Sequence, residues 1–143
     1  MGECFEDGPD RGRILVSGDD TGGRWSLMEY EVAARAAEEP LAYGPHLHRE
    51  IEETFIVQAG RLRFLLGEEV RDLGPGDRVC VSPGVRHGFA NVSGAPVKLL
   101  VSFHPGGFEQ LFVRHRTDQD PPPAADGFLL EATRDWASEF EPR

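Results

Sequence analysis

Glycine and proline divide residues 1–104 of this chain into short segments, and this division limits the folds that the chain can adopt. Within the segments, apolar and polar residues alternate with a period of two, which is typical of strands with one buried face. Many short strands at such spacing favour an all-β sandwich or barrel. The pattern predicts strands at residues 13–17, 24–34, 41–47, 52–58, 61–66, 78–82, 87–92 and 96–103.

The character of the sequence changes after Phe103. Residues 108–115 and 128–140 carry apolar side chains at helical spacing. Helices of this length are unstable alone, so we expect both to pack on the strands. The predicted organisation is a flexible segment at residues 1–12, one β domain at 13–104 and a helical extension at 105–143. We expect residues 33–39 to form a loop, because Pro40 would end a helix there.

Composition excludes several classes of protein. The net charge of −10 has the wrong sign for a face that binds nucleic acid or an anionic membrane. The apolar runs are too short for a membrane-spanning helix, and the N-terminus lacks the apolar core of a signal peptide. Cys4 and Cys80 are too few for a disulfide framework. We therefore expect a cytoplasmic protein whose partner is a small molecule.

Three of the five histidines lie in two short stretches of predicted strand and turn. His46 and His48 are two residues apart, so their side chains point to the same face of a strand. Glu53 shares a face with Phe55 in the next strand, and His87 lies in a later one. If these faces line the interior of a barrel, three imidazoles and one carboxylate meet there. Such a set suits one divalent transition metal.

The identity of the donor residues indicates an open transition-metal site. Glu52 is the rival carboxylate, but the shared parity with Phe55 and the spacing to Gly60 favour Glu53. The set has no thiolate, which argues against a closed structural zinc site. Fe, Mn, Ni, Co, Cu and Zn all remain candidates. On a six-coordinate ion, these ligands would leave two positions open for water, oxygen or a chelating substrate.

The two histidine stretches resemble the paired sequence motifs of the cupin superfamily. The first motif matches at His46, His48, Glu53 and Gly60. The second motif matches at Gly76, Gly84, His87 and Asn91. The chain departs from the family at Pro40, where a glycine is frequent, and at Ser82, where the second motif has its first proline. Neither departure falls on a ligand position.

The resemblance covers roughly residues 25–104. It implies a fold, a metal site and an oligomeric state, which composition alone does not indicate. It implies a double-stranded β-helix, or jelly-roll barrel, with a bound metal at His46, His48, Glu53 and His87. It also implies a homodimer. Aromatic residues of the strands would line the interior near the metal, either as core or as substrate pocket. These residues are Tyr30, Phe55, Phe89 and Phe103.

An open metal site in an apolar pocket leads to three functional hypotheses. The first is a metal-dependent dioxygenase that acts on a small chelating substrate such as a diketone, a flavonol or a similar aromatic compound. The resemblance points the same way, since many single-domain cupins are oxygenases. The second is a non-redox isomerase or polyketide cyclase that uses the metal as a Lewis acid. The third is a non-catalytic cupin that binds a small ligand. We favour an enzyme, and the dioxygenase among enzymes.

Overall fold

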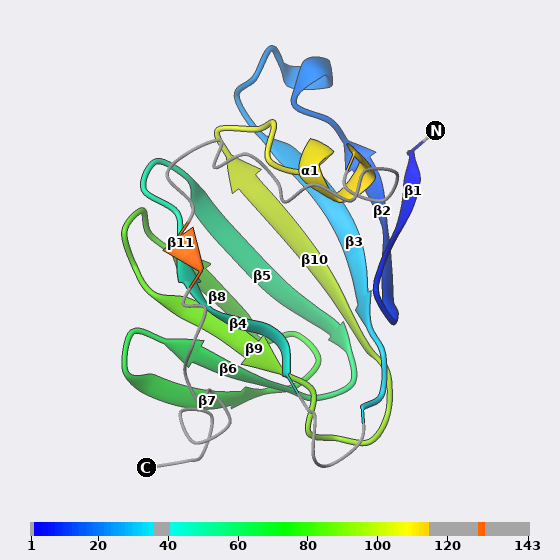
Figure 1. The fold of residues 1–143 in the computed structure, drawn as a ribbon, viewed down its shortest axis with the longest axis vertical. Coiled ribbons are helices and arrows are strands. Elements are labelled where there is room, and N and C mark those ends of the chain that lie inside the picture. The colour runs from blue at the N-terminus through cyan, green and yellow to red at the C-terminus, as the bar shows by residue number, and fades with distance from the viewer. Residues whose placement is uncertain (1, 36–40, 115–128, 131–143) are drawn as a thin grey trace.

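The structure is a computed structural model that describes residues 2–35, 41–114 and 129–130. These residues form mainly strands and turns (Figure 1). The elements in chain order are β1 (Cys4–Asp7), β2 (Asp10–Val16), the 3-10 helix η1 (Asp19–Thr21), β3 (Ser26–Val32), β4 (Leu41–Leu47), β5 (Glu52–Ala59), β6 (Leu62–Leu66), β7 (Glu69–Leu73), β8 (Arg78–Val81), β9 (His87–Ala90), β10 (Val97–His104), α1 (Gln110–Arg114) and β11 (Leu129–Leu130). In the described residues, no helix is long and apolar enough to cross a membrane.

The strands form two antiparallel sheets. The six-stranded sheet has the order β1-β2-β3-β10-β5-β8, and the five-stranded sheet has the order β11-β4-β9-β6-β7. Strands distant in sequence pair in both sheets, since β3 pairs with β10 and β4 pairs with β9. The chain therefore crosses repeatedly between the sheets, as in a jelly roll. The predicted all-β jelly-roll class is confirmed.

Period-two burial places the core between the sheets. In β3, every second residue from Ser26 to Val32 is buried, and β10 alternates in the same way from Val97 to Phe103. Phe55 of the six-stranded sheet meets Phe64 of the five-stranded sheet with ring centroids 4.9 Å apart. The inner faces of the two sheets thus share one apolar core, and side chains that point inward from either sheet can meet.

The N-terminal segment differs from our expectation. Residues 1–12, which we expected to be flexible, contain β1 and the start of β2, which form a hairpin around Gly8. The physical reason is Phe5, which is buried and packs on the rings of Tyr30 and Phe112. A single inward phenylalanine among acidic residues leaves no alternating pattern in the sequence, yet it orders the hairpin.

Two other segments also differ from the sequence prediction. Strand β7 was not predicted, because only Leu73 of its five residues is buried. Leu129 and Leu130, expected in a helix, form β11 and pair with β4. The rest of that predicted helix lies outside the described residues, as do residues 36–39 of the predicted loop. Within the predicted helical segment 108–115, α1 occupies Gln110–Arg114.

Candidate metal centre

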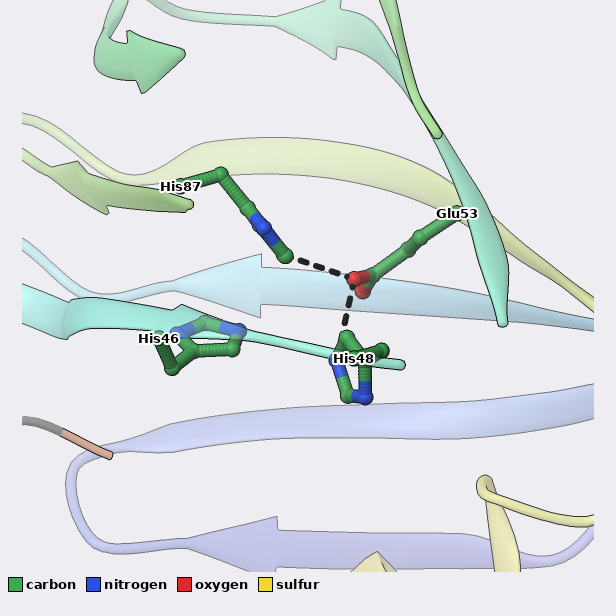
Figure 2. A group of neighbouring side chains, drawn as sticks. All are labelled: His46, His48, Glu53 and His87. Atoms are coloured by element: carbon green, nitrogen blue, oxygen red, sulfur yellow. Dashed lines mark hydrogen bonds and ion pairs between the residues drawn. The ribbon is translucent and has the colours of Figure 1, made fainter. Parts of the chain in front are cut away.

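Three neighbouring segments bring the predicted ligands together inside the barrel (Figure 2). His46 lies in β4 with His48 just beyond its end, Glu53 lies in β5, and His87 begins β9. His46 and His87 are register partners in the β4–β9 pair. The exposed fractions of His46, His48, Glu53 and His87 are 4%, 2%, 5% and 0%. Their ligand atoms all lie within 4.8 Å of one another.

The carboxylate of Glu53 joins two of the imidazoles (Figure 2). Its Oε2 atom lies 2.9 Å from Nε2 of His87 and 3.3 Å from Nε2 of His48. On the other side of the His87 ring, Nδ1 lies 2.9 Å from the carbonyl oxygen of Val85. A carbonyl oxygen only accepts, so Nδ1 of His87 carries the proton and donates it there. This bond fixes the ring so that Nε2 faces the cluster.

The contact between Glu53 and His87 makes the cluster a binding site for a cation. In a neutral His87 ring, the Nε2 lone pair would face a carboxylate oxygen at 2.9 Å, and two lone pairs repel at that distance. A proton or a metal ion between them removes the repulsion. The contact between Glu53 and His87 therefore requires positive charge at this point.

Glu53 supplies the negative charge of the cluster. Burial acts to raise its pKa, but hydrogen bonds from His48 and His87, together with their positive charge, outweigh burial and lower the pKa to about 2. The group is therefore a carboxylate at neutral pH. A buried carboxylate without a cation is costly, so the site is built to hold one.

The four side chains fit a divalent transition metal. Metal–ligand bonds of about 2.0–2.2 Å place two donors of one ion at most about 4.4 Å apart. The donors here lie within 4.8 Å, so small side-chain rotations would bring them to that spacing. Three imidazole nitrogens and one carboxylate oxygen suit Fe, Mn, Co, Ni, Cu or Zn. Both cysteines are exposed and lie outside the cluster.

A family comparison agrees with this geometry. A model of the cupin domain matches residues 28–104, which is more than half of the chain. The chain belongs to the cupin family. The resemblance that we inferred from the two histidine stretches is thereby confirmed, and the buried cluster of this cupin is typical of the metal sites of the family. No curated protein matches the chain.

Solved structures share the fold of this cupin. The polyketide cyclase RemF from Streptomyces resistomycificus is 27% identical with a TM-score of 0.56, over 68% of this chain and 66% of the cyclase. KdgF from Halomonas sp. is 19% identical with a TM-score of 0.60, over 75% of this chain and 90% of that one. The Streptomyces nucleoside dehydratase Pac13 is 18% identical with a TM-score of 0.56, over 76% and 80%. This cupin spans less than two thirds of the cyclase, and the other two likenesses concern the fold alone.

Beside the cluster, this cupin has a narrow cavity of about 20 Å³ with a largely apolar wall. Its lining residues are Met28, Tyr30, His46, His48, Glu53, Phe55, Phe89, Val101, Phe108 and Phe112. Of the predicted pocket residues, Tyr30, Phe55 and Phe89 therefore face the cavity. Phe103 does not line it and instead packs against Phe108, with ring centroids 5.4 Å apart.

The wall also contains residues that sequence reasoning missed. Met28 and Val101 share the inward parity of Tyr30 and could have been found from that pattern. Phe108 and Phe112 are four residues apart around the start of α1, a spacing that predicts a shared helix face but not the surface that it covers. The hydroxyl of Tyr30 donates to Asp7 at 2.7 Å. That bond ties β3 to the β1–β2 hairpin.

Proposed function

We propose that this cupin is a metal-dependent enzyme that rearranges a small, largely apolar substrate without oxidising it, as an isomerase or a cyclase does. The observation that carries the proposal is the position of the buried histidine–carboxylate cluster in the wall of an aromatic cavity. The likeness to a polyketide cyclase at 27% identity supports non-redox chemistry over the dioxygenase that we favoured from the sequence. The dioxygenase becomes the alternative that the experiment tests.

In this proposal His46, His48 and His87 hold the ion through nitrogen and Glu53 holds it through oxygen. A divalent ion bound there would supply Lewis acidity toward a carbonyl oxygen of the substrate. The aromatic side chains of the wall bind an apolar ring system and exclude water. Among the lining residues, Glu53 is the carboxylate, and the oxygen that does not bind the ion is the atom that can accept a proton from a substrate carbon.

Turnover with and without oxygen tests the proposal. The protein is loaded with Zn²⁺, Co²⁺, Mn²⁺ or Fe²⁺ in separate samples and incubated with diketones, flavonols and short poly-β-ketones. We expect products that are isomers or dehydration products of the substrate. We also expect equal rates in air and under nitrogen, and activity with redox-inert Zn²⁺. The matched control is His87→Ala, which we expect to be inactive with every metal.

Three results would contradict the proposal in different ways. A rate that falls to zero under nitrogen, with oxygen atoms in the product, would establish the dioxygenase. Tight binding of these compounds without turnover by any metal form would favour a non-catalytic binding protein. A wild-type protein that retains none of the metals would remove the basis of both enzymes.

The cytoplasmic location and the homodimer stay predictions. We propose a homodimer because the resemblance to other cupins implies one. Sedimentation equilibrium of the full chain would measure it, and a monomer at all concentrations would contradict it.

A further inference from the structure

The cavity beside the metal-ligand cluster is too small for a diketone or an aromatic ring. A volume of about 20 Å³ holds about one water molecule. All four ligands are buried, so the wall shields them from solvent. A diketone or an aromatic ring can approach the cluster only if part of this wall moves. Access to the cluster therefore depends on which lining residues can move.

The lining residues differ in how they are held. Most belong to β3, β4, β5, β9 or β10, or directly follow β4 as His48 does, and these strands are paired within the sheets. Phe108 and Phe112 belong instead to residues 105–114, which we call the cover segment and which includes α1. The structure records no strand pairing for this segment. A helix as short as α1 has little stability of its own. The cover segment is therefore the part of the wall that can move with the least loss of structure.

Phe108 stands where a substrate would have to lie. Its ring contacts the ring of His48 edge-on, with centroids 4.6 Å apart. It also packs on Phe103 and Phe112. Phe112 stacks in turn on Phe5 of β1, with centroids 5.1 Å apart. Phe108 thus covers a ligand imidazole directly, while Phe112 packs the cover segment against the N-terminal hairpin.

A buried carboxylate fastens the cover segment. Glu109 has no solvent exposure, although it lies in a turn near the surface loop that contains η1. Its Oε2 atom accepts a hydrogen bond from the N–H of Gly107 at 2.7 Å, and its Oε1 atom accepts one from the N–H of Gly18 at 2.5 Å. Gly18 is distant in sequence, so this bond ties the cover segment to the loop between β2 and β3.

We propose that the cover segment is a lid over the metal-ligand cluster, that Glu109 is its latch, and that the substrate takes the place of Phe108. The inference rests on the proposed function, because it assumes that a substrate reaches the cluster. The N–H of Gly106 also donates to the carbonyl oxygen of Gly23 at 3.1 Å. When this bond and the Glu109–Gly18 bond open, the segment lifts and Phe108 leaves the face of His48. The space that Phe108 vacates then limits the size of the ring system that the site accepts.

Access to the cluster measures the lid without any turnover. In the metal-free protein, diethyl pyrocarbonate acylates histidines that it can reach, and peptide mass spectrometry follows His46, His48 and His87 separately. Exposed His104 is the internal reference in each sample. In the loaded protein, the rate at which dipicolinate removes Co²⁺ reports the same access. The two readouts are independent, because the first needs no metal.

The decisive variant is Glu109→Gln. Glutamine keeps the size of the side chain but replaces one accepting oxygen with an NH₂ group, which cannot accept the bond from Gly18 or Gly107. Loss of one such bond shifts an opening equilibrium about tenfold. We expect both rates to rise about tenfold, while His104 reacts as before. The matched control is Asp72→Asn, which removes an exposed carboxylate paired with Arg63 and should change neither rate.

A second variant covers the case in which Glu109→Gln does not fold. Phe108→Ala keeps the latch and removes the ring over His48, so acylation of His48 should rise while Tm remains well above the assay temperature. Wild-type rates in the folded variants would overturn the lid. Failure of every variant and of the wild type to retain Co²⁺, with faster acylation in Glu109→Gln, would overturn the metal proposal and leave the lid standing.

Discussion

At the scale of the residue, one position along β5 decides whether the site exists. Glu53 points inward and is 5% exposed, whereas its neighbour Glu52 is on the outer face and exposed. A shift of one residue in register would exchange the two carboxylates. The inward position has a chemical consequence, because it brings the carboxylate between His48 and His87 and lowers its pKa.

This lowered pKa predicts a pH-dependent stability of the metal-free protein. The pKa of Glu53 is about 2 in the folded chain against an ordinary value of 4.5. A depressed pKa stabilises the fold above pH 4.5, and that contribution is lost as the pH falls from 4.5 toward 2. The Tm difference between wild type and Glu53→Gln should therefore be large at pH 6 and shrink below pH 4.5. Thermal unfolding followed by circular dichroism measures it.

Glu52→Gln is the matched control, since it makes the same change one residue away on an exposed side chain. We expect it to leave Tm nearly unchanged at every pH. A pH-dependent difference for Glu52→Gln instead of Glu53→Gln would contradict the assigned register of β5.

At the scale of the element, the β1–β2 hairpin depends on a close approach at Gly12. Gly12 and Phe5 are register partners, and the Phe5 ring lies over the glycine. A Cβ atom at position 12 would lie 2.4 Å from Cζ of Phe5 and 2.6 Å from the backbone oxygen of Glu29. The backbone of β3 cannot yield, so the hairpin requires a glycine here.

The substitution Gly12→Ala should therefore destabilise the protein by about 1–3 kcal/mol, the usual cost of overpacking. Because Phe5 stacks on Phe112, the substitution should also weaken the packing of the cover segment on the hairpin. Denaturant unfolding measures the loss. Gly74→Ala is the control, because the nearest atom to its added Cβ lies at 3.8 Å and its φ is not positive. A tolerated Gly12→Ala would mean that the hairpin can separate from β3.

The sequence predicts some elements better than others for physical reasons. His46, His48, Glu53 and His87 could be placed because period-two parity alone decides which face of a strand a side chain takes. Strand β7 could not be predicted, because an almost wholly exposed strand has no apolar alternation. The position of Phe108 over His48 also could not be predicted, since it depends on how the cover segment packs on strands that are distant in sequence. Parity is local information, and packing between segments is not.

At the scale of the whole molecule, the ligand cluster joins the two sheets. His46 and His87 belong to strands of the five-stranded sheet, and Glu53 belongs to a strand of the six-stranded sheet. A bound ion would therefore connect the two faces of the core. Removal of the ion would affect the packing of the entire barrel and not only one loop.

Metal should accordingly raise the thermal stability of the whole chain. At a free metal concentration of about 100 times Kd, binding to the folded state alone adds about 2.7 kcal/mol. For a domain of this size, that corresponds to a rise in Tm of roughly 5–10 °C. Differential scanning calorimetry with Co²⁺ or Zn²⁺ and after dialysis against a chelator measures the shift. His87→Ala should remain folded without metal and show no shift, and an equal shift in that variant would place the ion elsewhere.

One edge strand of each sheet, β1 or β11, lies beyond the range that matches the family. That range covers residues 28–104, but β2 pairs with β3 on one sheet, with β1 beyond it. On the other sheet, β11 pairs with β4 along Leu47 and His46. A fragment trimmed to 28–104 would leave the strand of a proposed metal ligand with a bare row of backbone donors and acceptors. Bare edges of this kind recruit other chains. Expression work on this protein therefore has reason to retain the residues on both sides of the recognised domain.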